Sequence, residues 1–282
     1  MASEKKYRQK WLKYHDSYEK RAYKELRKVF KKWNNKVFGI KFNEQSIKQQ
    51  LLETISFEDM FTTYQKIYFN IGSLHGSRVG RFINVELQKS FTMEDFMLLF
   101  ERDLPLFLRQ YGITRIQLVH QTYLDTIFKM FDDRLRAGKT LEETTNEVYR
   151  VMRSPRFYRW EAERIARTET TGAANYATIK SGAVSGYVMK KQWISATDVR
   201  TRRKPKSHYD HLEMNGKQIG LKENFIFNPK TLDEDILEYP GDPKGQAQNV
   251  INCRCTVAVV PARDKKGKLI RTNKANKHKI DA

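Results

Sequence analysis

The character of the sequence changes near residue 181, and this change constrains the fold more than any other feature. Upstream, apolar residues recur at three- and four-residue steps, which is typical of amphipathic helices. Downstream, glycines and prolines separate short apolar segments at residues 187–194, 225–227 and 256–260, which predict strands joined by structured loops. We therefore expect an α+β fold, in which a helical N-terminal region precedes a compact α+β C-terminal domain with a small sheet packed on a long helix. The predicted limits are residues 1–153 for the helical region, 154–261 for the α+β domain and 262–282 for a basic, flexible tail.

Residues 5–38 are predicted to form one long helix that ends at Gly39. One stripe of this helix is aromatic and aliphatic, and lysines and arginines fill the other faces. The stripe consists of Tyr7, Trp11, Tyr14, Tyr18, Ala22, Leu26, Val29 and Trp33. Acidic residues interrupt the polar face, which disfavours a membrane surface and favours docking on a partner protein or on the body of the fold. Of these two, we expect a partner protein.

Further helix boundaries follow from capping patterns. Residues 56–59 and 92–95 each resemble a capping box at a helix start, and Thr140 with Glu143 forms another. Ser154 followed by a proline predicts the start of a helix that runs to about residue 180.

The positive charge of the chain is unevenly distributed. The formal net charge is +20, and residues 1–41 carry fourteen basic and four acidic residues. Residues 261–282 and the patch 190–206 hold most of the remaining excess, which indicates contact with a polyanion rather than charge spread for solubility. In the patch we expect sequence-independent contacts to the phosphates of double-stranded DNA. The candidates are Lys190, Lys191, Arg200, Arg202, Arg203, Lys204 and Lys206.

Several classes of protein are disfavoured by what the sequence lacks. It has no apolar run long enough to span a bilayer and no visible export signal. Two cysteines make no disulfide framework, which predicts maturation in a reducing cytoplasm. Phosphate-cradling glycine loops and the common hydrolase motifs are also missing, so we do not expect an enzyme.

Four patches in the second half occur in a recognisable order. They are AERIARTET at residues 162–170, KQWISATD at 191–198, SHYDH at 207–211, and PGDP at 240–243 with NCRC at 252–255. Their order and spacing over residues 161–261 resemble the head-morphogenesis family typified by the F protein of phage Mu. The residues that match its pattern are Arg167, Glu169, Trp193, Asp198, His211, Gly216, Asp242, Cys253 and Cys255.

The resemblance implies a minor head protein of a tailed bacteriophage. Such a protein is made in the bacterial host cytoplasm and sits in the virion, inside the capsid near the portal. It aids head assembly and genome packaging or ejection, and its partners are the portal or other head proteins, with no membrane involved.

One departure from the family pattern concerns histidine. Residues 203–206 lengthen the stretch before the expected position. Counting back from Gly216 favours His211, and His208 remains as an alternative.

The two cysteines and the histidines raise the possibility of a structural zinc site. In an extended segment, Cys253 and Cys255 point to the same side, where His211, with His208 as a further candidate, would complete a ligand set. The alternative is a pair of buried thiols beside a hydrogen-bonded histidine.

An enzymatic alternative uses the same region. A nuclease or toxin-like enzyme could be built around His208, His211, Asp198 and Arg200, with a histidine in acid–base catalysis. Asp198 could equally form an ion-pair hub with Arg200 and Arg202 that orders the following loop.

Overall fold

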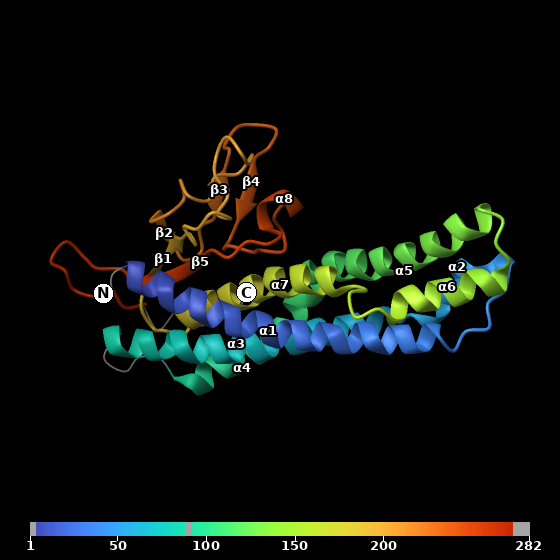
Figure 1. Cartoon of the computed structure of the whole chain (residues 1–282). Coiled ribbons are helices and arrows are strands. Elements are labelled where there is room, and N and C mark those ends of the chain that lie inside the picture. The colour runs from blue at the N-terminus through green and yellow to red at the C-terminus, as the bar shows by residue number, and fades with distance from the viewer. Residues whose placement is uncertain (1–3, 88–91, 273–282) are drawn as a thin grey trace.

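The computed structural model describes residues 4–87 and 92–272. Long helices form an elongated bundle, and a small lobe of strands and loops sits on one side of it towards one end (Figure 1). The helices are α1 (Glu4–Val37), α2 (Ile47–Thr54), α3 (Phe57–Leu87), α4 (Met93–Phe107), α5 (Ile113–Arg136), α6 (Leu141–Arg153), α7 (Arg159–Ala183) and α8 (Ala247–Val250), with short turns η1 (Glu44–Ser46) and η2 (Leu108–Gly112). A helical N-terminal region followed by an α+β part is the predicted fold class, which is therefore confirmed.

Helix α7 is the centre of the molecule. It packs on α1, α3, α4 and the strands of the lobe, so nearly every residue from Ala162 to Gly182 is buried. Its many alanines, threonines and glycines allow this close approach on all sides. At Gly172, a Cβ would lie 3.0 Å from the carbonyl oxygen of Gly241, so the lobe backbone can rest on the helix only because a glycine stands there.

The aromatic stripe of α1 is part of this same core. Trp11, Tyr18 and Trp33 are at most 2% exposed. The ring of Trp11 lies edge-on to His75 of α3, with ring centroids 5.4 Å apart, and Trp33 contacts Tyr123 of α5 at 4.8 Å. The expectation that the stripe docks on a partner protein is therefore wrong. The body of the fold takes that place, because α3, α5 and α7 supply an apolar surface as long as the stripe.

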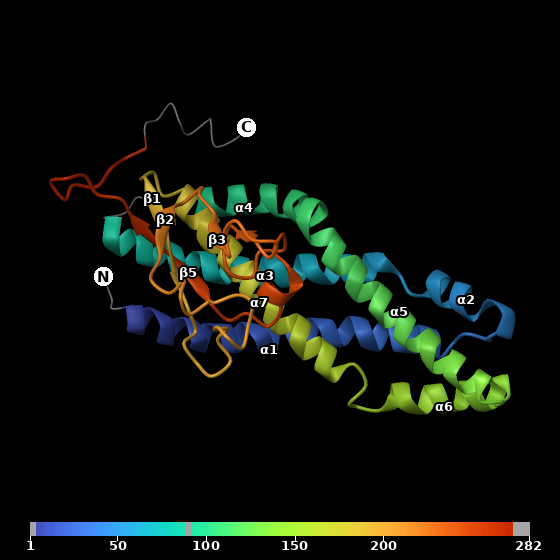
Figure 2. The same ribbon diagram turned by 90° about the horizontal axis from the view of Figure 1, so that it is seen from above.

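The lobe contains two small antiparallel sheets. Strands β1 (Met189–Ile194), β2 (Gln218–Gly220) and β5 (Thr256–Pro261) form a sheet in the order β2-β1-β5, and β3 (Phe225–Phe227) pairs with β4 (Asp235–Leu237). In the longer pairing, Trp193 lies opposite Val257 and both side chains are buried. Strand β5 contacts α7, so the predicted packing of a small sheet on a long helix is confirmed. Figure 2 shows this sheet lying across α7.

Capping signals located some helix starts and misplaced one. Thr92 caps α4, and Thr140 and Glu143 form a complete capping box at α6. Ser154, however, ends α6, and α7 starts only at Arg159. Tyr158 explains the delay: it has a positive φ of 56°, and its ring stacks on Phe30 of α1 with centroids 5.2 Å apart.

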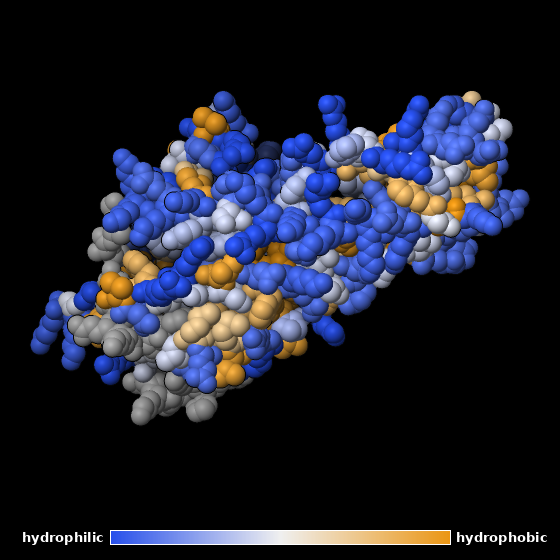
Figure 3. Space-filling model, turned by 60° about the horizontal axis from the view of Figure 1, so that its bottom comes forward, coloured by the Kyte–Doolittle hydropathy of each residue, from blue (hydrophilic) through white to orange (hydrophobic). Residues whose placement is uncertain are grey.

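The C-terminal segment is ordered as far as it is described. Arg263 forms an isolated antiparallel β-bridge with Leu269, and Arg271 forms another with Tyr187. Residues 262–272 therefore fold against the start of the lobe. The rest of the predicted flexible tail, residues 273–282, lies outside the described residues. Within the described ranges, no helix combines the length and apolar character needed to cross a bilayer. On the face seen in Figure 3, hydrophilic residues predominate and apolar ones form small patches.

Candidate metal centre

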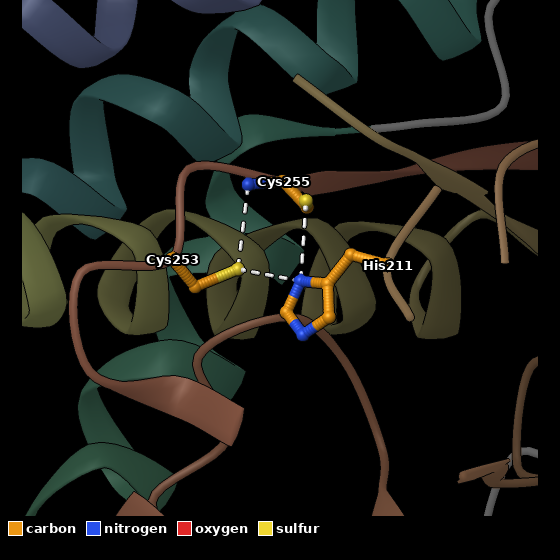
Figure 4. A group of neighbouring side chains, drawn as sticks. All are labelled: His211, Cys253 and Cys255. Carbon is orange, nitrogen blue, oxygen red and sulfur yellow. Dashed lines mark hydrogen bonds between the residues drawn. The ribbon is translucent and has the colours of Figure 1, made fainter. Parts of the chain in front are cut away.

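His211, Cys253 and Cys255 meet inside the lobe, although more than forty residues separate the histidine from the cysteines (Figure 4). The Nδ1 atom of His211 lies 3.5 Å from the Sγ atom of each cysteine. All three side chains are at most 2% exposed, and their potential ligand atoms lie within 4.8 Å of one another.

Local backbone contacts place each member of the group. The amide of His211 donates to the carbonyl oxygen of Arg202 at 3.0 Å, and its own carbonyl accepts from the Ser195 hydroxyl, so the loop folds back on the end of β1. Cys253 and Cys255 lie in the extended segment just before β5 rather than in a strand. The alternation of an extended chain still turns both thiols to one side.

The hydrogen bonds of His211 determine its tautomer. The buried carboxylate of Asp235 can only accept, so the Asn249 side chain must turn its Nδ2 towards it, at 2.8 Å. The Oδ1 atom of Asn249 then faces His211 Nε2 at 2.6 Å, and this nitrogen must donate. The Nδ1 atom therefore presents a lone pair to both sulfur atoms.

Burial and the contact between the two thiols give Cys253 and Cys255 different pKa values. Burial alone would raise the pKa of the Cys253 thiol, but hydrogen bonding from Cys255 and the proximity of His211 and Arg202 hold that pKa well below its usual value. The hydrogen bond to Cys253, together with burial, raises the pKa of Cys255 well above it.

The other residues of the sequence pattern make contacts within the lobe or between the lobe and the helices. Arg167 donates to Glu19 of α1 at 2.9 Å and to Asn252 at 3.0 Å. Arg254 forms an ion pair with Asp198. Asp242 accepts from two backbone amides of its own turn, and Gly216 takes a φ of +83° that favours glycine. Trp193 is fully buried, with its ring 5.4 Å from that of His211.

A family model described as phage Mu protein F like protein matches residues 125–258. Over these residues, which are a little under half of the chain, the sequence is similar to the phage Mu F-like family. The resemblance inferred from the motifs is thereby confirmed, and the family indicates a protein of phage head morphogenesis. The matched region begins inside α5, upstream of residue 154, and the domain limits drawn from the sequence stay predictions.

A curated relative adds sequence support without a function. An uncharacterized protein of Bacillus subtilis (strain 168), YqbB, is 29% identical over 106 residues, which cover 38% of this chain and 32% of that protein. The match thus spans about a third of the length of the relative. No solved structure matches the chain significantly.

Two residues of the Mu F-like region that the sequence marked as candidate site residues do not occupy the positions that their predicted roles require. His208 is exposed and lines a surface pocket with Lys204 and Lys206, so it stands outside the cysteine cluster. Lys191 is fully buried against the ring of Phe225, and its pKa is lowered to about 8 because burial penalises the charged ammonium. Its assignment as a DNA contact is corrected, since its ammonium does not reach the surface.

The remaining candidate DNA contacts lie in and beside the loop after β1. Lys190, Arg200, Arg203, Lys204 and Lys206 are exposed, whereas Arg202 is partly buried and donates to the carbonyl of Ile251. Acidic residues accompany this loop: Asp198 accepts from the amide of Arg200, and Asp210 accepts from that of Lys204.

Asn175 of α7 is a structural residue of the Mu F-like region that the candidate set omits. Its Nδ2 donates to the carbonyls of Pro240 and Cys255 at 2.8 and 3.2 Å, and its Oδ1 accepts from Val257 N and the Thr256 hydroxyl. One side chain thus ties the helix to the PGDP turn and to β5. In the sequence, only the alanines next to Asn175 indicate its role, because they predict that the helix is buried at this point.

A separate cavity of about 300 Å³ lies between α5, α7 and the segment 243–251. Glu169 forms part of its wall, accepting from Tyr68 at 2.9 Å, with Arg115 Nη1 3.7 Å away. Burial raises the pKa of Glu169, against the effect of Arg115 and the hydrogen bond from Tyr68. Arg115 carries no recognisable motif, and sequence reasoning did not find it.

Proposed function

We propose that this chain is a minor head protein of a tailed bacteriophage, located inside the capsid near the portal. It would aid head assembly and genome packaging or ejection, with the portal or other head proteins as partners. The observation that carries the proposal is the Mu F-like match over residues 125–258, which contains all the motifs found in the sequence. Synthesis in the bacterial host cytoplasm precedes incorporation into the virion.

The use of the motif residues supports a structural role. The polar groups of Arg167, Asp198 and Asp242 form hydrogen bonds and ion pairs within the chain. The cavity shared by Asp198, Arg200 and His211 has a volume of about 10 Å³, which is room for about one water molecule and not for a nucleotide. This small volume supports a structural role for these residues over a nuclease site.

The DNA-handling part of the proposal rests on a basic groove. It runs between α1 and the connection from α6 to α7, and has a volume of about 680 Å³. Six basic residues line it, and no acidic residue does so among the described parts of the chain. They are Lys24, Arg27, Lys28, Lys31, Arg153 and Arg159. Lys28 and Arg159 also pair with neighbouring glutamates, whereas Lys24 and Lys31 have no such partner among the described ion pairs.

Such a surface suits the phosphate backbone of double-stranded DNA without reading its bases. Each phosphate that a basic side chain neutralises releases counterions, so affinity falls with salt at a log–log slope of about −0.9 per contact. We infer that packaged DNA contacts the groove and that the exposed lysines elsewhere on α1 extend the contact.

The head role is tested by co-expressing the chain with the portal, scaffold and capsid proteins of the phage that encodes it. Assembled heads are purified by sedimentation, and the copies per head are counted by quantitative mass spectrometry. A few copies per head, lost when the portal gene is omitted, are expected. Heads that assemble normally and never contain the chain would contradict the proposal.

The DNA role is tested by titrating duplexes of unrelated sequence at several salt concentrations. The double variant Lys24→Glu/Lys31→Glu is expected to lower the magnitude of the slope by about 1.8. Lys66→Glu/Lys222→Glu is the matched control, because it reverses two exposed lysines outside the groove. Equal losses in both variants would remove the groove from the proposal. Incubation with magnesium should leave the DNA uncut, and cleavage would favour an enzyme instead.

A further inference from the structure

We propose that His211 Nδ1, Cys253 Sγ and Cys255 Sγ bind one zinc ion that fastens the lobe together. The inference goes beyond the head function and does not depend on it. It rests on the geometry, burial and hydrogen bonding of a cluster whose residues come from two distant stretches of the chain.

The spacing of the donor atoms fits a tetrahedral site. With Zn–S near 2.3 Å and Zn–N near 2.0 Å, tetrahedral geometry places the nitrogen and sulfur ligands about 3.6 Å apart. The two Nδ1–Sγ distances of His211 are both 3.5 Å. An ion can therefore enter between the donors with little movement of the side chains.

The surroundings of His211 match those of a metal-bound imidazole. A ligating histidine usually donates its other N–H to a carbonyl or carboxylate, which fixes the tautomer and the plane of the ring. Asn249 accepts from Nε2 in this way and is held by the buried Asp235. Asn249 is accordingly a positioning residue. A thiol–imidazole hydrogen bond alone requires one sulfur near Nδ1, whereas here two sulfurs lie at the same distance.

Charge balance also favours a divalent cation. Two thiolates and a neutral imidazole carry a charge of −2, so a zinc ion makes the buried site neutral. Binding releases the proton of each thiol that is still protonated to solvent. The fourth position faces the cavity of about 10 Å³ that these three residues share with Asp198, and one water molecule fits there.

The position of the site indicates a structural and not a catalytic ion. Its ligands are buried beneath Trp193 and Phe227, whose rings lie 5.4 Å from that of His211. Strands β2, β3 and β4 are only three residues long, so the lobe has few backbone hydrogen bonds to hold its loops. A zinc ion would join the loop that carries His211 to the segment that leads into β5, and would add to the stability that the small apolar core of the lobe supplies.

The first test measures zinc in the purified full-length protein by inductively coupled plasma mass spectrometry. One zinc per chain is expected in the parent protein and in His208→Gln. Cys255→Ser and His211→Gln should lose it. Asn249→Ala should weaken zinc binding roughly 10- to 100-fold, compared with the exposed control Asn224→Ala.

A second measurement remains decisive if the ligand variants fail to fold. Zinc is removed from the parent protein with a chelator and replaced by cobalt(II), and the absorption spectrum is recorded. Thiolate-to-cobalt charge transfer with intense d–d bands of tetrahedral cobalt is the expected result. Expression with added zinc that yields no bound zinc, together with no such bands, would overturn the proposal and leave a hydrogen-bonded thiol pair.

Discussion

The ring of His15 in α1 lies against Thr171 in α7, with 2.9 Å between Nε2 and the hydroxyl oxygen. The same hydroxyl donates to the carbonyl oxygen of Cys253 at 2.5 Å, so it must accept from His15. A chain of two hydrogen bonds therefore links the first helix, the central helix and the cysteine segment. It requires a proton on Nε2 of His15, and the buried surroundings of the ring require that it stay uncharged.

This requirement makes the fold sensitive to acid. Burial lowers the pKa of His15 to about 3, and burial likewise lowers that of His75 to about 3. Between pH 6.5 and 3 the unfolded chain binds protons that the folded chain does not. The free energy of unfolding should therefore fall as the pH decreases through this range, by about 1.4 kcal/mol per pH unit for each histidine.

Urea titrations at a series of pH values measure this slope. A His15→Gln variant keeps a donor near Thr171 and should show a shallower loss between pH 6.5 and 4. The exposed His208→Gln is the matched control and should leave the slope unchanged. Identical slopes in the parent and His15→Gln would show that His15 is protonated in the folded state.

Asn175→Ala should be among the most damaging substitutions in α7. It leaves the Val257 amide and the Pro240 carbonyl buried without their partner, and each unsatisfied group costs about 1–3 kcal/mol. We expect a loss of about 3 kcal/mol or more in chemical denaturation. Asn224→Ala, in an exposed loop, should change stability by less than about 0.5 kcal/mol. A similarly small effect at Asn175 would contradict the assigned bridge.

Helix α6 depends on the N-cap residue that precedes it. Thr140→Ala removes the hydroxyl that accepts from the Glu143 amide and should lower the free energy of unfolding by about 1 kcal/mol. Thr140→Ser retains the hydroxyl and should remain close to the parent. Melting curves of the three proteins, followed by circular dichroism, compare them directly, and equal midpoints for alanine and serine would argue against the cap.

The loop after β1 should contribute less to DNA binding than the basic groove. Lys204→Glu/Lys206→Glu is expected to change the salt slope by less than 0.9, which is less than one phosphate contact. The reason is that Asp210 and Asp233 lie beside these lysines, whereas the groove has no acidic lining among the described residues. The same salt titration decides the matter, and a larger effect in the loop would restore the candidates chosen from sequence.

Local patterns in the sequence predicted the elements well. The capping box at Thr140 and the strand at residues 225–227 follow from neighbouring residues alone, as does the stripe of residues 5–38. The surface on which that stripe packs could not be predicted from the sequence. Helices α3 and α7 are themselves partly apolar, and only the packed structure shows which apolar surfaces meet. Tyr158 displaced the start of α7 for the same reason, since its stacking on Phe30 is a long-range contact.

The candidate site divides in the same way. Spacing alone predicted that Cys253 and Cys255 point to one side, and the family pattern favoured His211 while leaving His208 as an alternative. In the structure His211 lies beside the cysteines. Asn249 and Asp235 could not be predicted, because a hydrogen-bonded amide and carboxylate carry no motif. Burial of Lys191 was also hidden, since its neighbours in the sequence are polar and only the sheet encloses it.

The contacts of α1 with the lobe bear on the order in which the protein is made. Trp11 Nε1 donates to the carbonyl of Arg254, and Arg8 donates to that of Ser195, across separations of 243 and 187 residues. During synthesis, α1 leaves the ribosome long before the lobe has been made. Until then, its aromatic stripe is either exposed to solvent or covered by α3. A fragment limited to the Mu F-like residues would emerge without that first helix, and its central helix would meet water along one side. The packing of the lobe thus includes contacts from a helix that is synthesised well before it.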